Sequence, residues 1–361
     1  MQMAKKIMMK GNVAAAEAAI RGGAEFFAGY PITPSTETLE TLSFRMPEEG
    51  RVFIQAENEI ASINMVLGAA ACGARAFTTS SGPGMALKQE GFSYAARMEL
   101  PYVVMNVQRW GVGLGMLDSG QVDYLRDTRA GGNGDYRHIV YAPDSVQELV
   151  DDLYEAFDVS QKYRMGVLIL SEGYLGQMME AVELPPFKEI RRPDWGLDGT
   201  GEVGLKQLCP TYNMALAHEL LPVRQERINR VCREMQRWES VETEDADYVL
   251  VAFGLPARVC VDAVRRLREE GCKVGLIRPK LVFPFPYDAF HRVNPNVRGF
   301  ISVETNDLGQ MVQDVALAAK RELPQRNVPV YCYTHSAGVP RVQDVVRYYR
   351  SVLDGAVKEV Y

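Results

Sequence analysis

Short apolar strands alternating with helices are the feature of this sequence that most constrains its fold. Residues 101–107 form an almost wholly apolar run, as expected of a strand that is buried on both faces. Helical and extended segments alternate on either side of it, from residue 12 to about residue 170. This alternation predicts an α/β fold, in which a parallel sheet is covered by helices on both faces.

The length of 361 residues favours two domains. Pro185 and Pro186 mark a boundary, so we expect a first domain over residues 1–185. Residues 186–247 are expected to form a linker with a long charged helix over about 212–238, followed by a polar connector. A second alternating unit then begins and predicts another α/β domain over residues 248–361.

Charge and hydropathy exclude several classes of protein. The net charge is −6 and the basic residues are scattered, which argues against a nucleic-acid surface. No stretch is apolar enough to cross a bilayer, and the N-terminus lacks the pattern of a secretion signal. A cytoplasmic protein without membrane association is therefore expected. The six cysteines and four histidines are dispersed, so no metal or iron–sulfur site is expected on this chain.

Local signals place two turns and a helix in the first domain. After a strand over 26–30, Thr33 is expected to cap the next helix, with Pro34 at its first position. A helix is expected over residues 59–72. A loop is expected over residues 79–84, before a helix that ends near residue 98.

Three motifs stand out in this domain: GYPITPST over residues 29–36, QAENEIAS over 55–62 and TTSSGPG over 78–84. Together with ETNDLGQM over 304–311, they resemble the alpha subunit of 2-oxoacid:ferredoxin oxidoreductases, within the pyruvate:ferredoxin oxidoreductase superfamily. The 2-oxoisovalerate (3-methyl-2-oxobutanoate) type is the most similar. The resemblance implies a pyrimidine-binding thiamine diphosphate domain followed by a domain like the C-terminal domain of transketolase.

Glu59 is the residue expected to activate the cofactor. Thiamine diphosphate becomes a nucleophile when a carboxyl group meets its pyrimidine nitrogen in a dry pocket. Glu59 begins an apolar helix, and its distance to Gly68 matches the spacing in pyrimidine-binding domains. Glu57 is the second choice. In the alternative interpretation, both carboxylates only favour the positive end of the helix.

Thr33 and Arg109 resemble the family residues that contact the carboxylate of the 2-oxoacid. Arg109 follows a buried strand at the carboxyl end, where open sheets place ligands, and a guanidinium suits a carboxylate. An ordinary helix cap and a surface arginine are the alternative interpretations.

Two segments are expected to contact the cofactor ring. Pro31 and Ile32 precede Thr33, and the segment Ser81, Gly82, Pro83, Gly84 permits a close approach of the backbone. A tight turn before a helix is the alternative for the second segment.

The resemblance also implies partner subunits. The sequence has no Gly-Asp-Gly segment, and the nearest glycine cluster, over 131–135, lacks the required order. A diphosphate-binding beta subunit would therefore hold Mg²⁺ and share thiamine diphosphate at the subunit interface. Iron–sulfur clusters are expected on gamma and delta subunits, or their fusions, which pass electrons to ferredoxin.

The expected reaction is the CoA-dependent oxidative decarboxylation of a 2-oxoacid to an acyl-CoA. The apolar run over residues 110–117 favours a branched-chain substrate such as 2-oxoisovalerate, which leaves no buried charge unpaired. Arg126 and Arg129 leave 2-oxoglutarate as an alternative substrate, because either arginine could pair with the second carboxylate of that substrate.

Two alternatives belong to other classes. One is a non-redox thiamine diphosphate decarboxylase that is split across chains. The other is a non-catalytic α/β scaffold protein, in which the motifs are only turns and caps.

Overall fold

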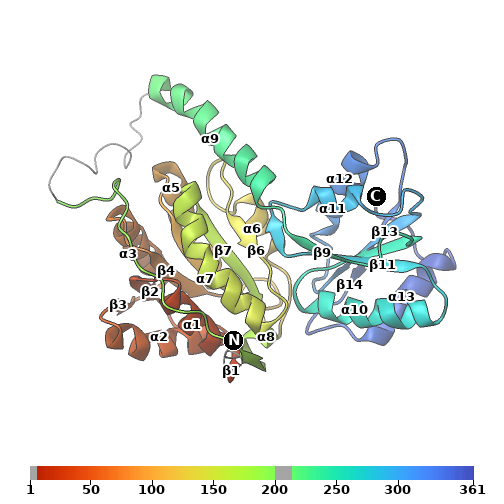
Figure 1. Ribbon diagram of the computed structural model, residues 1–361, viewed down its shortest axis with the longest axis horizontal. Helices are drawn as coiled ribbons and strands as arrows, with labels where there is room; N and C mark the ends of the chain where they lie inside the picture. The colour runs from red at the N-terminus through yellow and green to blue at the C-terminus, as the bar shows by residue number, and fades with distance from the viewer. Residues whose placement is uncertain (1–5, 200–213) are drawn as a thin grey trace, which may run out of the picture.

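The computed structural model describes residues 6–199 and 214–361 as two α/β domains that lie side by side (Figure 1). Within the described residues, the first domain is built on a seven-stranded sheet that is parallel except at one edge. Its order is β12 (Leu281–Phe283), β6 (Ile139–Tyr141), β7 (Gly166–Glu172), β5 (Tyr102–Gln108), β4 (Ala76–Ser80), β2 (Phe26–Gly29) and β3 (Val52–Gln55).

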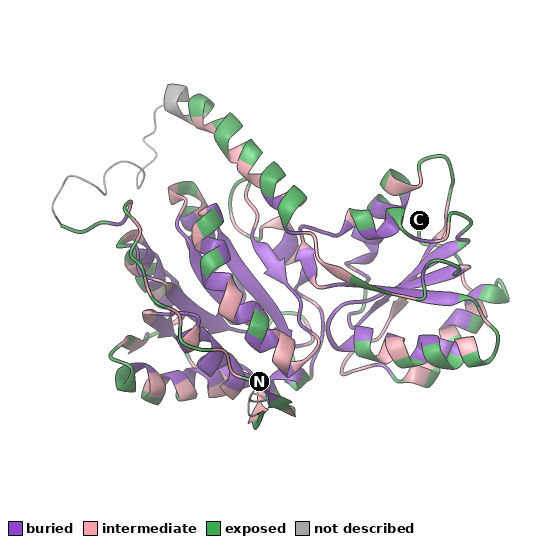
Figure 2. Ribbon diagram, in the orientation of Figure 1, coloured by how far each residue is buried: buried purple, intermediate pink, exposed green. Residues whose placement is uncertain are grey.

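Helices cover both faces of this sheet, as its apolar strands require. The strands of the first sheet are largely buried (Figure 2). In β5 every residue is buried, and successive apolar side chains belong to different cores. Val103 and Met105 belong to the core with α1 (Gly11–Arg21), α2 (Thr36–Glu48) and α7 (Val146–Tyr163). Tyr102 and Val104 belong to the opposite core, with α3 (Glu59–Ala71) and α5 (Gln89–Met98).

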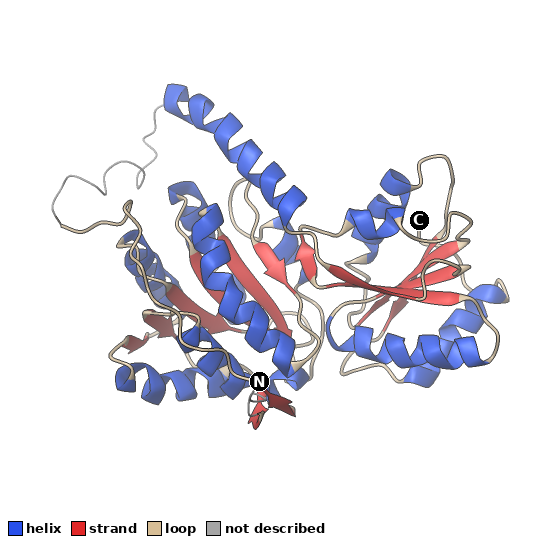
Figure 3. Ribbon diagram, in the orientation of Figure 1, coloured by secondary structure: helices blue, strands red, loops and turns tan. Residues whose placement is uncertain are grey.

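The second domain has a five-stranded sheet among the described residues (Figure 3). Its order is β14 (Val330–Thr334), β13 (Gly299–Glu304), β10 (Tyr248–Val251), β11 (Val274–Pro279) and β9 (Trp238–Val241), with β9 antiparallel. One face packs on α10 (Gly254–Glu269) and α13 (Val342–Leu353). The other face packs on α11 (Tyr287–His291) and α12 (Val312–Glu322).

Shorter elements complete the chain. β1 (Ile7–Lys10) and β8 (Met179–Val182) form a two-stranded antiparallel sheet. The short helices are α4 (Gly82–Leu87), α6 (Tyr124–Arg129) and α8 (Gly173–Gln177).

The boundary between the domains is less simple than the sequence suggests. The expected polar connector over 239–247 is partly wrong, because β9 begins there and pairs with β11. The strand β12 comes from the expected second domain but pairs with β6 in the sheet of the first domain. Both strands are short and lie at a sheet edge, where the apolar pattern is weak.

The long charged helix is confirmed as α9 (Met214–Glu234), which runs toward the junction of the two domains (Figure 1). The start of the expected range, residues 212–213, lies outside the described residues. Glu99, after α5, anchors α9 through Arg227 and Arg224, at 2.9 and 3.5 Å. None of the helices in the described ranges combines the length and the apolar character that a membrane span needs.

Two predicted helix starts are wrong. α2 begins at Thr36 after Ser35, so Thr33 lies too far ahead to cap it, and Pro34 belongs to the preceding turn. The expected loop over 79–84 is shorter, because β4 extends through Ser80 and α4 begins at Gly82. Pro83 occupies an early helical position, where its missing N–H is tolerated.

Candidate active site

The predicted site residues come together at the carboxyl edge of the first sheet. Thr33 follows β2, the segment 81–84 follows β4, and Arg109 follows β5, and these three strands are neighbours. Glu59 follows β3, the next strand along. Because these strands are parallel, their carboxyl ends meet at one edge, where open α/β sheets bind ligands.

Glu59 is the buried carboxyl of this site. Only 6% of its surface is exposed, whereas Glu57 is exposed. The side chain of Asn58 accepts a 2.8 Å hydrogen bond from Ala61 N and so fixes the first turn of α3. A Cβ atom at Gly84 would lie 2.5 Å from Glu59 Oε1, so only a glycine leaves this carboxyl its present place. The geometry therefore favours Glu59 over Glu57 as the functional carboxyl.

Arg109 links three segments around the site. Its guanidinium is buried, and it donates to Thr33 O at 2.8 Å and to Leu114 O at 2.6 Å. Its Nε would lie 2.9 Å from a Cβ atom at Gly82, and it has no hydrogen-bond partner within the described chain. Burial lowers the pKa of Arg109, while the charges of Asp123 and Glu59 oppose that effect. Arg109 is thus not a surface arginine.

The segment around Thr33 contributes mainly through its backbone. Thr33 is exposed, whereas Pro31 and Ile32 are half-buried. Ser35 closes the turn, because its N and Oγ both donate to Ile32 O at 2.9 Å. The carbonyl of Thr33 is the atom that holds Arg109, and its hydroxyl remains at the surface of the site.

Two buried hydroxyls beside the site are without partners. Ser80 Oγ and Ser81 Oγ make no hydrogen bond to any described residue, and neither does Arg109 Nε. Ser80 Oγ and Glu59 Oε1 both lie against the position that a Cβ atom at Gly84 would take. Unsatisfied buried polar atoms need an explanation, and a polar ring ligand at this place would supply one. The residues present therefore fit the pyrimidine end of thiamine diphosphate.

Arg126 has a different place from the one predicted. It forms ion pairs with Asp123 at 2.8 Å and Asp127 at 3.0 Å, and Asn106 donates to both of these carboxylates. Its Nη1 also donates to Gly82 O at 3.3 Å, so this cluster supports the 81–84 segment from behind. Such support depends on contacts between β5 and α6 that no sequence motif marks.

Arg129 is also engaged, through a 2.6 Å ion pair with Asp314 of the second domain. Both arginines that could have paired with the second carboxylate of 2-oxoglutarate therefore already have carboxylate partners within the chain.

Lys88 is a functional candidate that the sequence reasoning missed. It lies between α4 and α5 and is fully buried. Its ammonium donates to Ser62 Oγ, to Thr78 Oγ1 at 3.2 Å and to Glu59 O at 3.4 Å. The signal in the sequence was a lysine that comes directly after the apolar residues 85–87, which follow the glycine-rich segment.

The apolar run over residues 110–117 is largely exposed in this chain, so its contact with a branched-chain substrate stays a prediction. Val112 is 96% exposed and Leu114 is 78% exposed, and Met116 and Leu117 are also exposed. Glycines at 111, 113 and 115 adopt positive φ angles, which bend the segment into a compact loop. The loop presents its apolar side chains to solvent beside Arg109.

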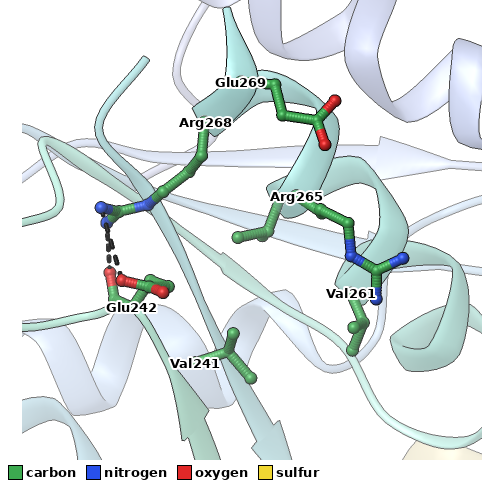
Figure 4. Close-up of a pocket in the computed structure, with 7 residues that line it drawn as sticks. Val241, Glu242, Val261, Arg265, Arg268 and Glu269 are labelled. Atoms are coloured by element: carbon green, nitrogen blue, oxygen red, sulfur yellow. Dashed lines mark hydrogen bonds and ion pairs between the residues drawn. The ribbon is translucent and has the colours of Figure 1, made fainter. Parts of the chain in front are cut away.

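One hollow of the second domain lies apart from the predicted site. The hollow in Figure 4 lies between β9 and α10 in the second domain and contains none of the predicted site residues. Its Arg268 is paired with Glu242 and Asp245. Across residues 6–199 and 214–361, no group of three or more His, Cys, Asp or Glu side chains is placed to hold a metal ion.

Comparison with known families connects this geometry to an activity. The family described as pyruvate flavodoxin/ferredoxin oxidoreductase, thiamine diP-binding, matches residues 17–239. Core domain II of pyruvate:ferredoxin oxidoreductase matches residues 246–345. This chain belongs to the 2-oxoacid:ferredoxin oxidoreductase family, as an alpha subunit. It contains the thiamine diphosphate-binding domain of that family, and the family consists of oxidoreductases rather than scaffold proteins.

Two curated relatives of this alpha subunit differ in the substrate that their names give. Ketoisovalerate oxidoreductase subunit VorB of Methanothermobacter marburgensis is 44% identical over 316 residues, which are 86% of this chain and 89% of the relative. 2-Oxoglutarate synthase subunit KorA of Archaeoglobus fulgidus is 37% identical over 317 residues, with coverages of 85% and 90%.

Two solved structures confirm the fold of the alpha subunit. The 2-oxoglutarate:ferredoxin oxidoreductase of Magnetococcus marinus, with 2-oxoglutarate, coenzyme A and succinyl-CoA bound, has a TM-score of 0.83 at 28% identity. That match covers 97% of this chain and 66% of the other, so the present chain spans just under two thirds of that relative's length. A split-gene transketolase, at 14% identity and a TM-score of 0.59, shares the fold over 96% of this chain and 98% of its own.

Proposed function

We propose that this subunit activates thiamine diphosphate for the CoA-dependent oxidative decarboxylation of 2-oxoisovalerate, with electrons passed to ferredoxin. The observation that carries the proposal is the buried Glu59 carboxyl beside Gly84, at the sheet edge to which Arg109 and Thr33 also come. One site thus offers a carboxyl for a ring nitrogen and a cation for a carboxylate.

Glu59 is the proton-carrying residue in this proposal. Thiamine diphosphate, when bound, supplies a nucleophilic carbon and stabilises the negative charge that decarboxylation leaves. The carboxyl of Glu59 holds a proton against the pyrimidine nitrogen and exchanges it with that nitrogen as the cofactor is activated. The burial of Glu59 excludes water from this contact.

Arg109 and Thr33 hold the substrate carboxylate. Two of the five guanidinium N–H groups already donate to carbonyls, which fixes the plane of the side chain. The remaining N–H groups, including the unpartnered Nε, can donate to an anion. The exposed hydroxyl of Thr33 completes the contact, and Pro31, Ile32 and residues 81–84 lie against the cofactor ring.

Partner subunits complete the site in this proposal. A beta subunit would bind the diphosphate and Mg²⁺, and gamma and iron–sulfur delta subunits, or their fusions, would accept the electrons. The helices next to Glu59 support a subunit interface, because they carry large exposed apolar side chains: Ile60, Met65, Leu87 and Tyr94. The exposed apolar loop over residues 110–117 continues this surface beside Arg109. We place the complex in the cytoplasm.

The substrate assignment rests on charge. A second substrate carboxylate needs a free cation, and both Arg126 and Arg129 are paired with aspartates. The loop over residues 110–117 would instead offer apolar contacts to a branched chain once a partner covers it. The VorB relative, at 44% identity, agrees with this preference. 2-Oxoglutarate is the second candidate, supported by the KorA relative and the Magnetococcus marinus structure.

The test is an anaerobic assay of the complex purified with its natural partner subunits. CoA-dependent reduction of an electron acceptor is measured with 2-oxoisovalerate, 2-oxoglutarate and pyruvate. We expect kcat/KM to be highest for 2-oxoisovalerate by roughly tenfold or more. A higher value for 2-oxoglutarate would overturn the substrate assignment and leave the reaction class intact. Turnover that needs no electron acceptor would favour the non-redox decarboxylase.

The role of Glu59 is tested by Glu59→Gln in the same complex. Loss of the proton-carrying group is expected to lower kcat by about 100-fold or more. Glu57→Gln is the matched control, since this carboxylate is exposed two residues earlier and its loss should leave kcat within about twofold. A Glu59→Gln complex with wild-type kcat would exclude the proposed role.

A further inference from the structure

Lys88 is a buried cation to which the proposed reaction gives no role. Its side chain is fully buried where α4 meets α5, on the inner side of the first turn of α3. The ammonium contacts two hydroxyls and one backbone carbonyl, those of Ser62, Thr78 and Glu59. All three partners are neutral, and no carboxylate within the described residues forms an ion pair with it.

Such a cation is costly for stability. Burying an ammonium without a direct counter-ion is strongly unfavourable, and an apolar side chain of similar length would fill the same space without that cost. Burial lowers the pKa of Lys88 to about 7, and the charge of Glu59 acts in the opposite direction. A position that stability alone would give to methionine is therefore occupied by a titratable group.

Glu59 is the acidic group whose charge acts on Lys88. All residues of strand β4, which contacts Lys88 through Thr78, are neutral, and α5 begins with the neutral Gln89. The other charged groups nearby are exposed or paired: Glu90 on α5, and Asp123 and Asp127 with Arg126. Arg109 is a second cation on which the same Glu59 charge acts. The carboxyl proposed to meet the cofactor thus acts electrostatically on two cations, and one of them, Lys88, contacts the backbone of the same residue.

We propose that Lys88 is a positioning residue for Glu59, whose buried ammonium stabilises the carboxylate form of that side chain when it gives its proton to the bound cofactor. The inference rests on the proposed function, since it takes Glu59 as the proton-carrying group. The proton moves from Glu59 to a ligand nitrogen, and Lys88 keeps its own. In a buried site a nearby positive charge lowers the free energy of the resulting carboxylate.

The contacts of Lys88 also fix the geometry of Glu59. The ammonium donates to Glu59 O and to Ser62 Oγ, and Ser62 Oγ in turn donates to Glu59 O at 2.9 Å. These bonds hold the backbone of the residue whose carboxyl must meet the ligand. Charge and geometry can be separated by substitution, because Thr78 contacts Lys88 without contacting Glu59 in the described structure.

The first test needs no cofactor. NMR of isotopically labelled lysine side chains in the full chain follows the titration of Lys88, which is assigned by its absence in Lys88→Met. Glu59→Gln is expected to lower the titration midpoint of Lys88 by about half a pH unit or more, because the carboxylate favours the ammonium. Glu90→Gln is the control, since its exposed carboxylate is closer in sequence but should leave the midpoint unchanged. An equal midpoint in the wild type and Glu59→Gln would overturn the proposal, even if Lys88→Met itself fails to fold.

The second test uses the assembled complex. Lys88→Met is expected to lower kcat by roughly tenfold or more, to leave the KM for the 2-oxoacid within about twofold, and to remove an inflection near neutral pH from the kcat profile. Thr78→Val removes one hydroxyl partner but keeps the charge, so its pH profile should match the wild type. Equal losses in both variants with unchanged pH profiles would show a purely structural lysine and overturn the proposal.

The two proposals fail in different ways. A wild-type complex without thiamine diphosphate-dependent turnover would refute the proposed function, whatever Lys88 does. An active wild-type complex with an unaltered Lys88→Met profile would refute the positioning role alone.

Discussion

At the scale of single residues, two glycines determine where the charged groups of the site can lie. Gly82 leaves room for the Arg109 guanidinium, and Gly84 leaves room for the Glu59 carboxyl. Both glycines lie in the first turn of α4, so one short helix aligns a cation and a carboxyl. Side chains at either position would have to displace one of the two charged groups.

Gly84→Ala is expected to lower the activity of the assembled complex by about 100-fold while the chain still folds. The new Cβ atom would meet the end of the Glu59 side chain, which can move aside but then leaves its working position. Activity and urea denaturation are measured together. Gly68→Ala, in the same helix as Glu59, is the control, because its Cβ atom meets nothing within 4 Å. It should keep full activity and gain about 0.5–1 kcal/mol of stability.

Glu172 predicts a pH dependence of folding stability. Burial raises the pKa of this carboxyl to about 7, and its Oε1 accepts from Leu255 N at 2.9 Å and from Gln121 Nε2 at 3.1 Å. Because the folded pKa lies above the ordinary value of 4.5, the stabilisation from this group is complete below pH 4.5 and is lost as the pH rises to 7. The loss amounts to roughly 3 kcal/mol.

Urea denaturation of the wild type and Glu172→Gln at pH 5 and pH 8 checks this expectation. The glutamine variant should gain stability relative to the wild type as the pH rises, because it cannot ionise. Parallel pH profiles of the two proteins would contradict the raised pKa.

At the scale of elements, Glu99 ties the middle of α9 to the end of α5, whereas the end of α9 is held separately by Glu234 with Lys162 and by the buried Val231. Burial alone would raise the pKa of Glu99, but the hydrogen bond and charge of Arg227, aided by Arg224, lower it. Because the pKa of Glu99 is lower in the folded protein, the ion pairs stabilise the fold fully at a pH above the ordinary carboxyl pKa. This stabilisation is lost as the pH falls through the pKa that Glu99 has in the folded protein.

Glu99→Gln is therefore expected to loosen the middle of α9 without unfolding the protein. Limited proteolysis should cut α9 several-fold faster, while the free energy of unfolding changes by about 1 kcal/mol or less, since Arg224 and Arg227 are partly exposed. Glu226→Gln breaks an ion pair within α9 itself and serves as the control. Equal cleavage rates in both variants would show that Glu99 is not the anchor.

The elements differ in how far the sequence could predict them. The strand over 101–107 and the helix from Glu59 were predicted closely, because a continuous apolar run or an apolar helix marks each one. The edge strands β9 and β12 were not, because a short edge strand is defined by its partner and not by its own residues. The start of α4 was missed because Gly82 and Gly84 suggest a loop.

The candidate site shows the same division. Glu59, Thr33 and Arg109 could be proposed from motifs, and the structure brings them to one sheet edge. The partners of Arg126, and the burial of Lys88 beneath Glu59, come from contacts between distant segments. No local pattern encodes such contacts, so these two residues needed the fold.

At the scale of the whole molecule, Asp314 is one of several groups that join the domains, beside the polar contacts of Gln121 and Glu172 and the pairing of β12 with β6. Asp314 accepts from Tyr124 Oη and from Arg129 Nη2, each at 2.6 Å. Both Asp314 and Tyr124 are buried, so this contact lies inside the junction and not at its surface.

Asp314→Ala should weaken the coupling between the domains. It leaves Arg129 without its carboxylate and the buried Tyr124 hydroxyl without its acceptor, at a cost of about 3–5 kcal/mol. Calorimetry should then show a lower unfolding temperature than in the wild type. Asp262→Ala, which removes an exposed ion pair with Arg265 within α10, is the control and should leave the unfolding curve unchanged. An unchanged unfolding temperature in Asp314→Ala would contradict the role of this contact.

The strand β12 has a consequence for how this gene can be divided or recombined. A protein truncated at residue 247 would lack the strand that pairs with β6, and the uncovered edge would invite aggregation. A cut placed after Phe283 would instead sever the second sheet between β10 and β13, which are paired strands. Neither half is therefore a transferable module, and chimeras between relatives are expected to succeed only when both halves are exchanged together.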